Sequence, residues 1–515
     1  MNLRLSMTTQ TFGSTPRRLA LLCLPLALAA CGLTRPPAVA DAPIPTQWNA
    51  PLPKATAAAE TPAAALPHAG SLPGLSDWWR QLDDPVLVAL VEAAQAASPT
   101  VASASARIVE ARATRVQSGA ALLPTLDGTL SAQRSNSPMS GTGGGAGESS
   151  TSLPGVTTLQ AGLQSSWEID LFGGRRASRD AAQSRLQSAN AKWHDARVSV
   201  AAETANQYFA ERACQRQLAV AESDARSRSE TARLTDLSAK AGFTAPADAA
   251  LARASAADAS GRLKQQGAQC AVLRKGLVAL SGLDARVLDQ QLATVASDRA
   301  LPVVHAVASV PAQMLAQRPD VFAAELAVAA ASADVGAAEA DRYPRLTLQG
   351  SVAALQLRSG GASQDLQTWT IGPLALTLPI FDGGTRAANA ASAKARYEEA
   401  VSLYRGSVRT AVREVEEALV NLQATDARTG DADTAVQNYQ ASFNATQARY
   451  ESGLASLFEL EDARRTLFAA QTARVALQRE RAEAWVALYR STGGGWTRPD
   501  AALAQNTSSL SPTTP

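Results

Sequence analysis

The chain has 515 residues, of which 46% are hydrophobic and 18% charged, so it can bury a large core. A formal net charge of +2 without a basic stretch excludes a protein whose main partner is nucleic acid. Aromatic residues make up only 5%, and alanine, the strongest helix former, is abundant, which predicts a largely helical protein.

The N-terminus has the pattern of an export signal. Arg17 and Arg18 precede the apolar run Leu19–Ala30, which is too short to cross a bilayer but suits a signal peptide. The stretch Leu-Ala-Ala-Cys ending at Cys31 resembles a bacterial lipobox, so we expect Cys31 to carry a lipid. Gly32 after it favours the outer membrane. Ordinary cleavage that leaves the cysteine unmodified is the alternative.

Proline placement predicts very long helices. The segment 32–75 is rich in Pro, Ala and Thr and reads as an extended linker. Two later stretches, 155–245 and 380–498, contain no proline, and proline breaks helix interiors. A helix over most of either stretch would reach on the order of 100 Å and must pack against neighbours.

Four short segments alternate between apolar and polar residues, which predicts strands with one apolar face. The clearest runs from Leu159 to Leu171, and weaker or shorter ones begin at Leu126, Leu346 and Leu374. Gly/Ser-rich stretches at 141–152 and 359–364 predict the turns of two hairpins.

The whole pattern occurs twice. In each half, a helical stretch between two prolines leads to a strand pair, which ends in Phe-Gly-Gly or Phe-Asp-Gly-Gly. A long helix, a glycine turn and a returning helix follow. Glycine tolerates the backbone angles needed where a strand becomes a helix, so two repeats need two such joints.

Four strands are too few to close a membrane barrel, because such barrels need about eight or more. An open sheet would expose unpaired edges to lipid, so several chains would have to share one barrel. A soluble sandwich with a polar outer surface is the alternative.

Cys214 and Cys270 lie at similar distances from the first glycine turn, on two helices expected to be antiparallel. An exported protein permits a disulfide between them. Two independent buried thiols are the alternative.

Six motifs in order resemble the outer membrane factor family of TolC-like channels, and its NodT-type lipoprotein branch in particular. They are DWWRQLDDPVLVALVEAA, WEIDLFGGRR, QRPDVFAAE, AEADRYPRLTLQGS, LPIFDGG and ARYESGLASLFELEDARRTL. The resemblance implies a homotrimer whose chains each give four strands to a shared twelve-stranded barrel. It also implies a long α-helical barrel that continues from it through the periplasm, with a belt of shorter helices.

The resemblance also implies an aperture where the helical hairpins end. Its acidic lining would come from Asp248, Glu459 and Asp462, which would favour cations. A local alternative, compatible with lining, is helix capping: Ser456 and Glu459 form a capping-box pattern, and acids stabilise a helix start.

Gly242, Tyr450 and Gly453 match the family's residues that meet the periplasmic adaptor protein. The two glycines also suit ordinary helix C-caps.

The leading functional prediction is a passive exit duct in a tripartite efflux pump, which carries drugs or toxic small molecules. Its partners would be an adaptor, an inner-membrane pump of the resistance-nodulation-division type, and outer membrane lipid. The alternatives are the channel of a type I protein secretion system and a periplasmic coiled-coil scaffold without a pore. With no catalytic, metal-binding or cofactor motif in the sequence, we expect neither an enzyme nor a cofactor.

The predicted organisation is a signal peptide at 1–30, a lipidated N-terminus and linker at 31–75, repeats at 76–285 and 286–496, and a flexible tail at 497–515. Strands are expected at about 125–172 and 346–381, long helices at about 174–283 and 384–492, and periplasmic tips at 242–248 and 453–462.

Overall fold

The computed structural model describes residues 35–45, 48, 50, 79, 82, 84–136, 155–295, 315, 318–359, 361–496 and 498. The expected signal peptide, Cys31, most of the linker, the first strand-pair turn and nearly all of the C-terminal tail lie outside these residues.

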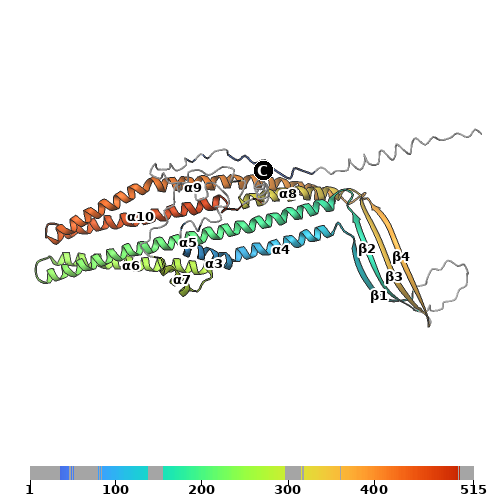
Figure 1. Cartoon of the computed structure of the whole chain (residues 1–515), viewed down its shortest axis with the longest axis horizontal. Coiled ribbons are helices and arrows are strands. Elements are labelled where there is room, and N and C mark those ends of the chain that lie inside the picture. The colour runs from blue at the N-terminus through green and yellow to red at the C-terminus, as the bar shows by residue number, and fades with distance from the viewer. Residues whose placement is uncertain are drawn as a thin grey trace, which may run out of the picture. The chain divides into compact units, whose positions relative to one another are not determined.

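Long helices and a single sheet make up the described chain (Figure 1). The helices are α3 (Pro85–Ala97), α4 (Pro99–Ala120), α5 (Gly174–Lys240), α6 (Pro246–Ser281), α7 (Ala285–Ala293), α8 (Pro319–Ala340), α9 (Thr385–Glu451) and α10 (Leu457–Ser491). The strands are β1 (Thr125–Ser135), β2 (Val156–Ile169), β3 (Arg345–Ser359) and β4 (Ala362–Thr377).

The chain divides into two compact units. The first contains residues 1–40, 110–186 and 327–401, and therefore the sheet; the second contains 41–109, 187–326 and 402–515, and therefore both helical hairpin ends.

The sheet of the first unit is antiparallel with the order β1-β2-β3-β4, so the two predicted strand pairs join through β2 and β3. β4 begins at Ala362, inside the stretch that the sequence assigns to a turn. The turn is this tight because Gly361 adopts a positive φ of 89°, which few other residues tolerate.

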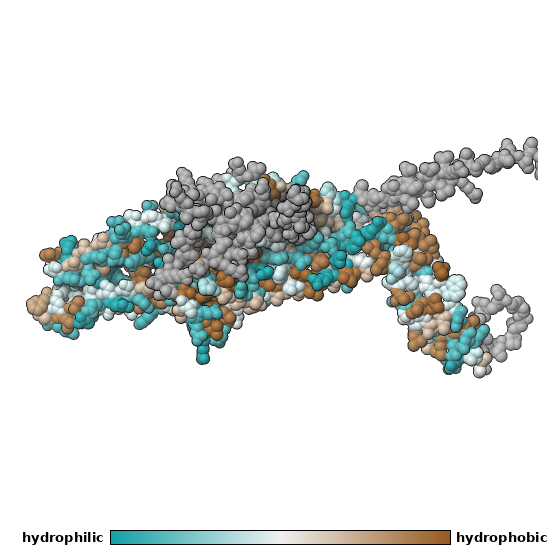
Figure 2. Space-filling view, viewed as in Figure 1, coloured by the Kyte–Doolittle hydropathy of each residue, from teal (hydrophilic) through white to brown (hydrophobic). Residues whose placement is uncertain are grey.

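One face of the sheet is apolar and exposed. The register places Trp369 opposite Val352, and both side chains are exposed, at 72% and 63%. Leu130 and Ile371 are 87% and 84% exposed. Figure 2 shows hydrophobic side chains gathered over these strands. An exposed apolar face of this kind indicates a surface that contacts lipid or another apolar surface.

The second unit is held together by buried alanines, larger apolar side chains and a few buried charges. Arg318 is one of these charges: its side chain is 6% exposed and pairs with Asp320 and Glu414, each at 2.7 Å. It also donates a hydrogen bond to the Ser491 carbonyl at 3.1 Å. Arg318, which directly precedes α8, thus connects the start of α8 to α9 and to the end of α10.

Candidate functional site

Both helical hairpins end in the same backbone motif. The Phe243 N–H donates to the Ser238 carbonyl at 2.9 Å, and the Leu454 N–H donates to the Arg449 carbonyl at 2.7 Å. Gly242 and Gly453 sit in the left-handed region, with φ of 79° and 71°. These are glycine-terminated helix C-caps, so the local role predicted for both glycines is present.

The residue after each glycine is apolar and exposed. Phe243 is 87% exposed and Leu454 is 71% exposed. In this type of cap the residue after the glycine usually packs back onto the helix. Its exposure at both ends marks a surface suited to contact with another molecule.

Tyr450 lies between the two hairpins. Its hydroxyl is 3.2 Å from the Thr235 hydroxyl, and its ring packs against the small core of Ala232, Ala252 and Leu457. Tyr450 thus joins α9 to α5 just before the hairpin turns.

Glu459 forms the predicted capping box. Its carboxylate accepts a hydrogen bond from the Ser456 N–H at 2.7 Å, and the Ser456 hydroxyl accepts from the Glu459 N–H at 3.2 Å. The Ser456 backbone donor holds the pKa of the Glu459 carboxyl below its ordinary value.

Asp462 and Asp248 are both exposed on the first turns of their helices or close to them. Asp462 pairs with Arg465 at 2.6 Å, an ion pair that sequence reasoning missed although the spacing of three residues on a helix allows it. Asp248 lies in the first turn of α6, after Pro246. Any acidic lining at this end therefore includes the Arg465 cation.

Cys214 and Cys270 are joined by a disulfide that links α5 to α6, with their Cα atoms 5.6 Å apart. Both residues are buried.

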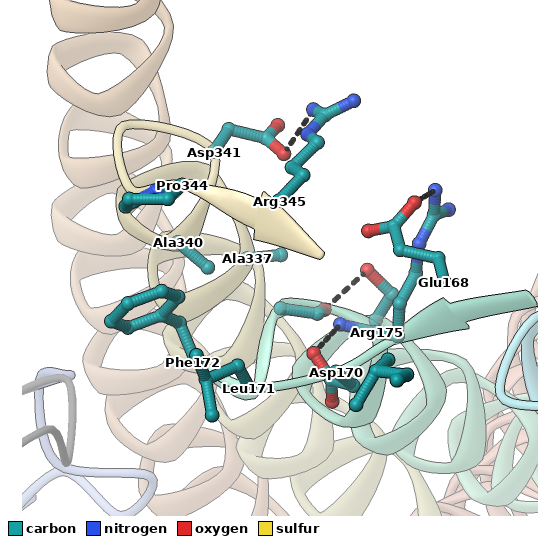
Figure 3. A pocket seen from close by; sticks show the side chains of 13 residues that line it. Glu168, Asp170, Leu171, Phe172, Arg175, Ala337, Ala340, Asp341, Pro344 and Arg345 are labelled. Atoms are coloured by element: carbon teal, nitrogen blue, oxygen red, sulfur yellow. Dashed lines mark hydrogen bonds and ion pairs between the residues drawn. The ribbon is translucent and has the colours of Figure 1, made fainter. Parts of the chain in front are cut away.

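A second feature, in the first unit, is a cavity of about 320 Å³ at the joint between the sheet and α5 (Figure 3). Arg175 pairs with Glu168 at 2.6 Å and Arg345 with Asp341 at 2.8 Å, so its charges largely neutralise one another. Gly174 is required here, because a Cβ would lie 2.8 Å from that of Ala340. The cavity marks a structural joint.

Within the described residues, no group of three His, Cys, Asp or Glu is placed to hold a metal ion.

Comparison with known proteins agrees with this architecture. Residues 90–283 and 310–494 match the family of outer membrane efflux proteins. The pyoverdine export outer membrane protein OpmQ of Pseudomonas putida is 32% identical over 487 residues, covering 93% of this chain and 98% of that protein. Nodulation protein T of Rhizobium leguminosarum bv. viciae is 27% identical, covering 96% of each.

Solved structures show the same fold. The outer-membrane channel OprN matches with a TM-score of 0.73 at 28% identity, covering 89% of this chain and all of that one. VceC of Vibrio cholerae matches with a TM-score of 0.70 at 27% identity, covering 81% and 98%. A four-stranded sheet joined to long helical hairpins thus defines an outer membrane channel of the TolC-like class.

The chain belongs to the outer membrane efflux protein family. Solved structures that this chain resembles are outer membrane channels.

Proposed function

We propose that three copies of this chain form one channel, with the four strands of each copy contributing to a twelve-stranded barrel. The supporting observation is the sheet itself. β1 and β4 are its edges, and its apolar face is exposed. Unpaired strand edges are unstable in lipid, and pairing β4 of one copy with β1 of the next removes all of them.

The channel would serve as the passive exit duct of a tripartite efflux pump. Relatives are named for pyoverdine export, solvent efflux and toluene efflux, all of which involve small molecules. We therefore propose drugs or toxic small molecules as cargo, delivered by an inner-membrane pump of the resistance-nodulation-division type through a periplasmic adaptor. Export of proteins for a type I secretion system is the second candidate.

The hairpin ends would form the aperture and meet the adaptor. Glu459 and Asp462 are exposed, and with Asp248 they would line the narrow end. Gly242, Tyr450 and Gly453 shape the surface that the adaptor contacts, to which the exposed Phe243 and Leu454 side chains add apolar area.

The two halves of the chain would be structural repeats. Each half carries a glycine joint after its strand pair and a glycine-capped hairpin end. On this proposal, repeat 1 occupies 76–285 and repeat 2 occupies 286–496, preceded by the signal peptide and linker and followed by a flexible tail.

A lipid on Cys31 would anchor the N-terminus in the outer membrane. Arg35 lies against Gly336, and the Ser332 hydroxyl bonds to the Pro36 carbonyl, so this segment runs antiparallel to α8. Arg35 therefore lies nearer than Pro36 to the end of α8 where β3 begins, and Cys31 precedes Arg35 by only four residues in the sequence.

The test uses the purified, full-length protein in detergent and in planar bilayers. We expect a trimer on chemical crosslinking, a discrete channel conductance, and a lipid-modified N-terminal peptide in mass spectrometry. Glu459→Ala combined with Asp462→Ala should weaken cation preference and raise conductance. A monomer that does not conduct would contradict the channel, whereas unchanged conductance and selectivity in the double variant would contradict only the acidic aperture.

A further inference from the structure

Two exposed arginines lie at the hairpin end of the sheet, which is the end opposite to the starts of α5 and α9. Arg134 on β1 is paired with Thr157 on β2, and Thr157 is paired with Arg358 on β3. Residues directly opposite one another in a sheet share a face, so the three side chains lie on the same side. We name Arg134, Thr157 and Arg358 the arginine row.

The arginine row belongs to the apolar face of the sheet. Arg358 lies six positions beyond Val352, which is paired with Trp369, and the register is continuous between Val352 and Arg358. Side chains alternate along a strand, so an even number of positions places two residues on one face. Arg134 likewise lies four positions beyond the exposed Leu130. The two arginines therefore border the apolar face at its hairpin end.

The apolar part of this face has the height of a membrane core. Leu346 and Gln356 on β3 are ten positions apart, which corresponds to about 34 Å along an antiparallel strand. In a barrel with a strand tilt of about 40°, this length gives a height of about 26 Å, close to the apolar band of about 25 Å in membrane barrels.

The same face becomes polar where this band ends. Gln356 donates a hydrogen bond to Asp365 on β4 at 2.9 Å, and Figure 2 shows hydrophilic side chains gathered toward this end of the strands. Arg358 lies two positions beyond Gln356, or about 5 Å higher. The arginine row is therefore at the level expected for lipid headgroups.

The two guanidinium groups are available to an anion. Among the residues that the structure describes, no carboxylate forms an ion pair with Arg134 or Arg358, and Asp365 accepts from Gln356 instead. β1 and β3 are separated by β2 alone, so their backbones are about 10 Å apart. Two arginine side chains can converge across this distance above the Thr157 hydroxyl. Guanidinium groups bind phosphate through paired hydrogen bonds, which makes phosphate the matching anion.

We propose that the arginine row binds the phosphates of a phosphorylated glycolipid in the outer leaflet of the membrane, one lipid for each copy of the chain. The inference rests on the proposed channel, in which the apolar face contacts lipid and the hairpin end faces outward. A lipid is favoured over free phosphate because the exposed Leu130 and Val352 continue the same face below the row, where acyl chains would lie.

The experiment uses the purified full-length trimer in detergent and lipid A that carries two phosphates. Native mass spectrometry should show up to three lipids retained on each wild-type trimer. Arg134→Gln combined with Arg358→Gln should weaken retention about tenfold or more, because it removes the charged phosphate donors. The control is Lys264→Gln combined with Lys275→Gln, which removes the same charge from exposed positions on α6 and should leave retention unchanged.

Two further probes identify what the row recognises. Lipid A stripped of both phosphates should bind the wild type no better than intact lipid A binds the double arginine variant. Inorganic phosphate at millimolar concentration should not displace intact lipid A. Equal retention of the stripped lipid would overturn the phosphate contact, and displacement by inorganic phosphate would overturn the assignment to a lipid.

Conductance in planar bilayers separates this inference from the proposed function. The double arginine variant should conduct as the wild type does, because the arginine row faces away from the lumen. A wild-type protein that forms no conducting trimer would contradict the channel itself. A conducting trimer that retains lipid A equally with and without the arginines would overturn only the inference. If the double variant does not assemble, the two single variants replace it, and wild-type retention in both would have the same meaning.

Discussion

Asp170 and Asp382 hold the first turns of the two longest helices in the same way. Asp170 accepts hydrogen bonds from the N–H groups of Arg175 and Arg176 at 3.0 and 2.9 Å. Asp382 accepts from those of Gly384 and Arg386 at 3.0 and 3.1 Å. Each aspartate thus satisfies N–H groups that a helix start leaves without partners.

Replacement of Asp170 by alanine should lower the free energy of unfolding by about 1 kcal/mol, the usual effect of losing a helix N-cap. Asp170→Asn keeps an oxygen acceptor and should cost less. Thermal unfolding of the purified protein, followed by circular dichroism, measures both. Equal melting temperatures for wild type and Asp170→Ala would show that the cap does not stabilise α5.

Sequence reasoning predicts much of this fold because its signals are local. Alternation marks the strands, proline-free alanine-rich stretches mark the long helices, and glycines mark the joints. In contrast, Arg228 and Glu461 pair with each other although they lie 233 residues apart in the sequence. The hydrophobic pattern within one segment does not show which residues of another segment face it. Arg465 could have been found from its spacing to Asp462, and Ser456 with Glu459 was found from the sequence.

Arg318→Ala should destabilise the helical unit by about 3–5 kcal/mol, because it leaves Asp320 and Glu414 without their shared cation. The matched control is Arg413→Ala, next to Glu414 on α9. Arg413 forms an exposed ion pair with Glu417, and its loss should cost no more than about 0.5 kcal/mol. Chemical denaturation gives both values, and similar losses for the two variants would refute a special role for Arg318.

Ile371→Arg should impair assembly in the outer membrane, since a charge on a lipid-facing strand position costs about 2–4 kcal/mol near the bilayer midplane. Its neighbour Thr370 lies on the opposite face of β4, where its hydroxyl is 2.8 Å from that of Ser351. Thr370→Arg should therefore be tolerated. The readout is the yield of heat-sensitive trimer on semi-native gels, and equal yields for the two variants would argue against a lipid-facing sheet.

Replacing both Cys214 and Cys270 with serine should lower the free energy of unfolding by about 2–5 kcal/mol, because the bond closes a long loop in the unfolded chain. In the exported wild-type protein, both thiols should resist alkylation until a reductant is added. Free alkylation of the native protein without reductant would show that the bond does not form in the cell.

Glu459, which we propose to line the aperture, should stay charged at a lower pH than an ordinary glutamate. The folded-state pKa of Glu459 lies below its ordinary value of 4.5, because the Ser456 N–H and hydroxyl donate to the carboxylate. A depressed pKa means that the carboxylate stabilises the hairpin above the unfolded-state pKa, and that this contribution is lost as the pH falls through the folded pKa. In an Asp462→Asn background, cation preference should therefore persist below pH 4.5.

Ser456→Ala removes one of the two donors and should move the loss of preference to higher pH, while Thr466→Ala, further along α10, should not. Reversal potentials recorded across a pH series give the midpoint for each variant, and coincident midpoints for Ser456→Ala and its parent would show that the capping box does not set the charge of Glu459.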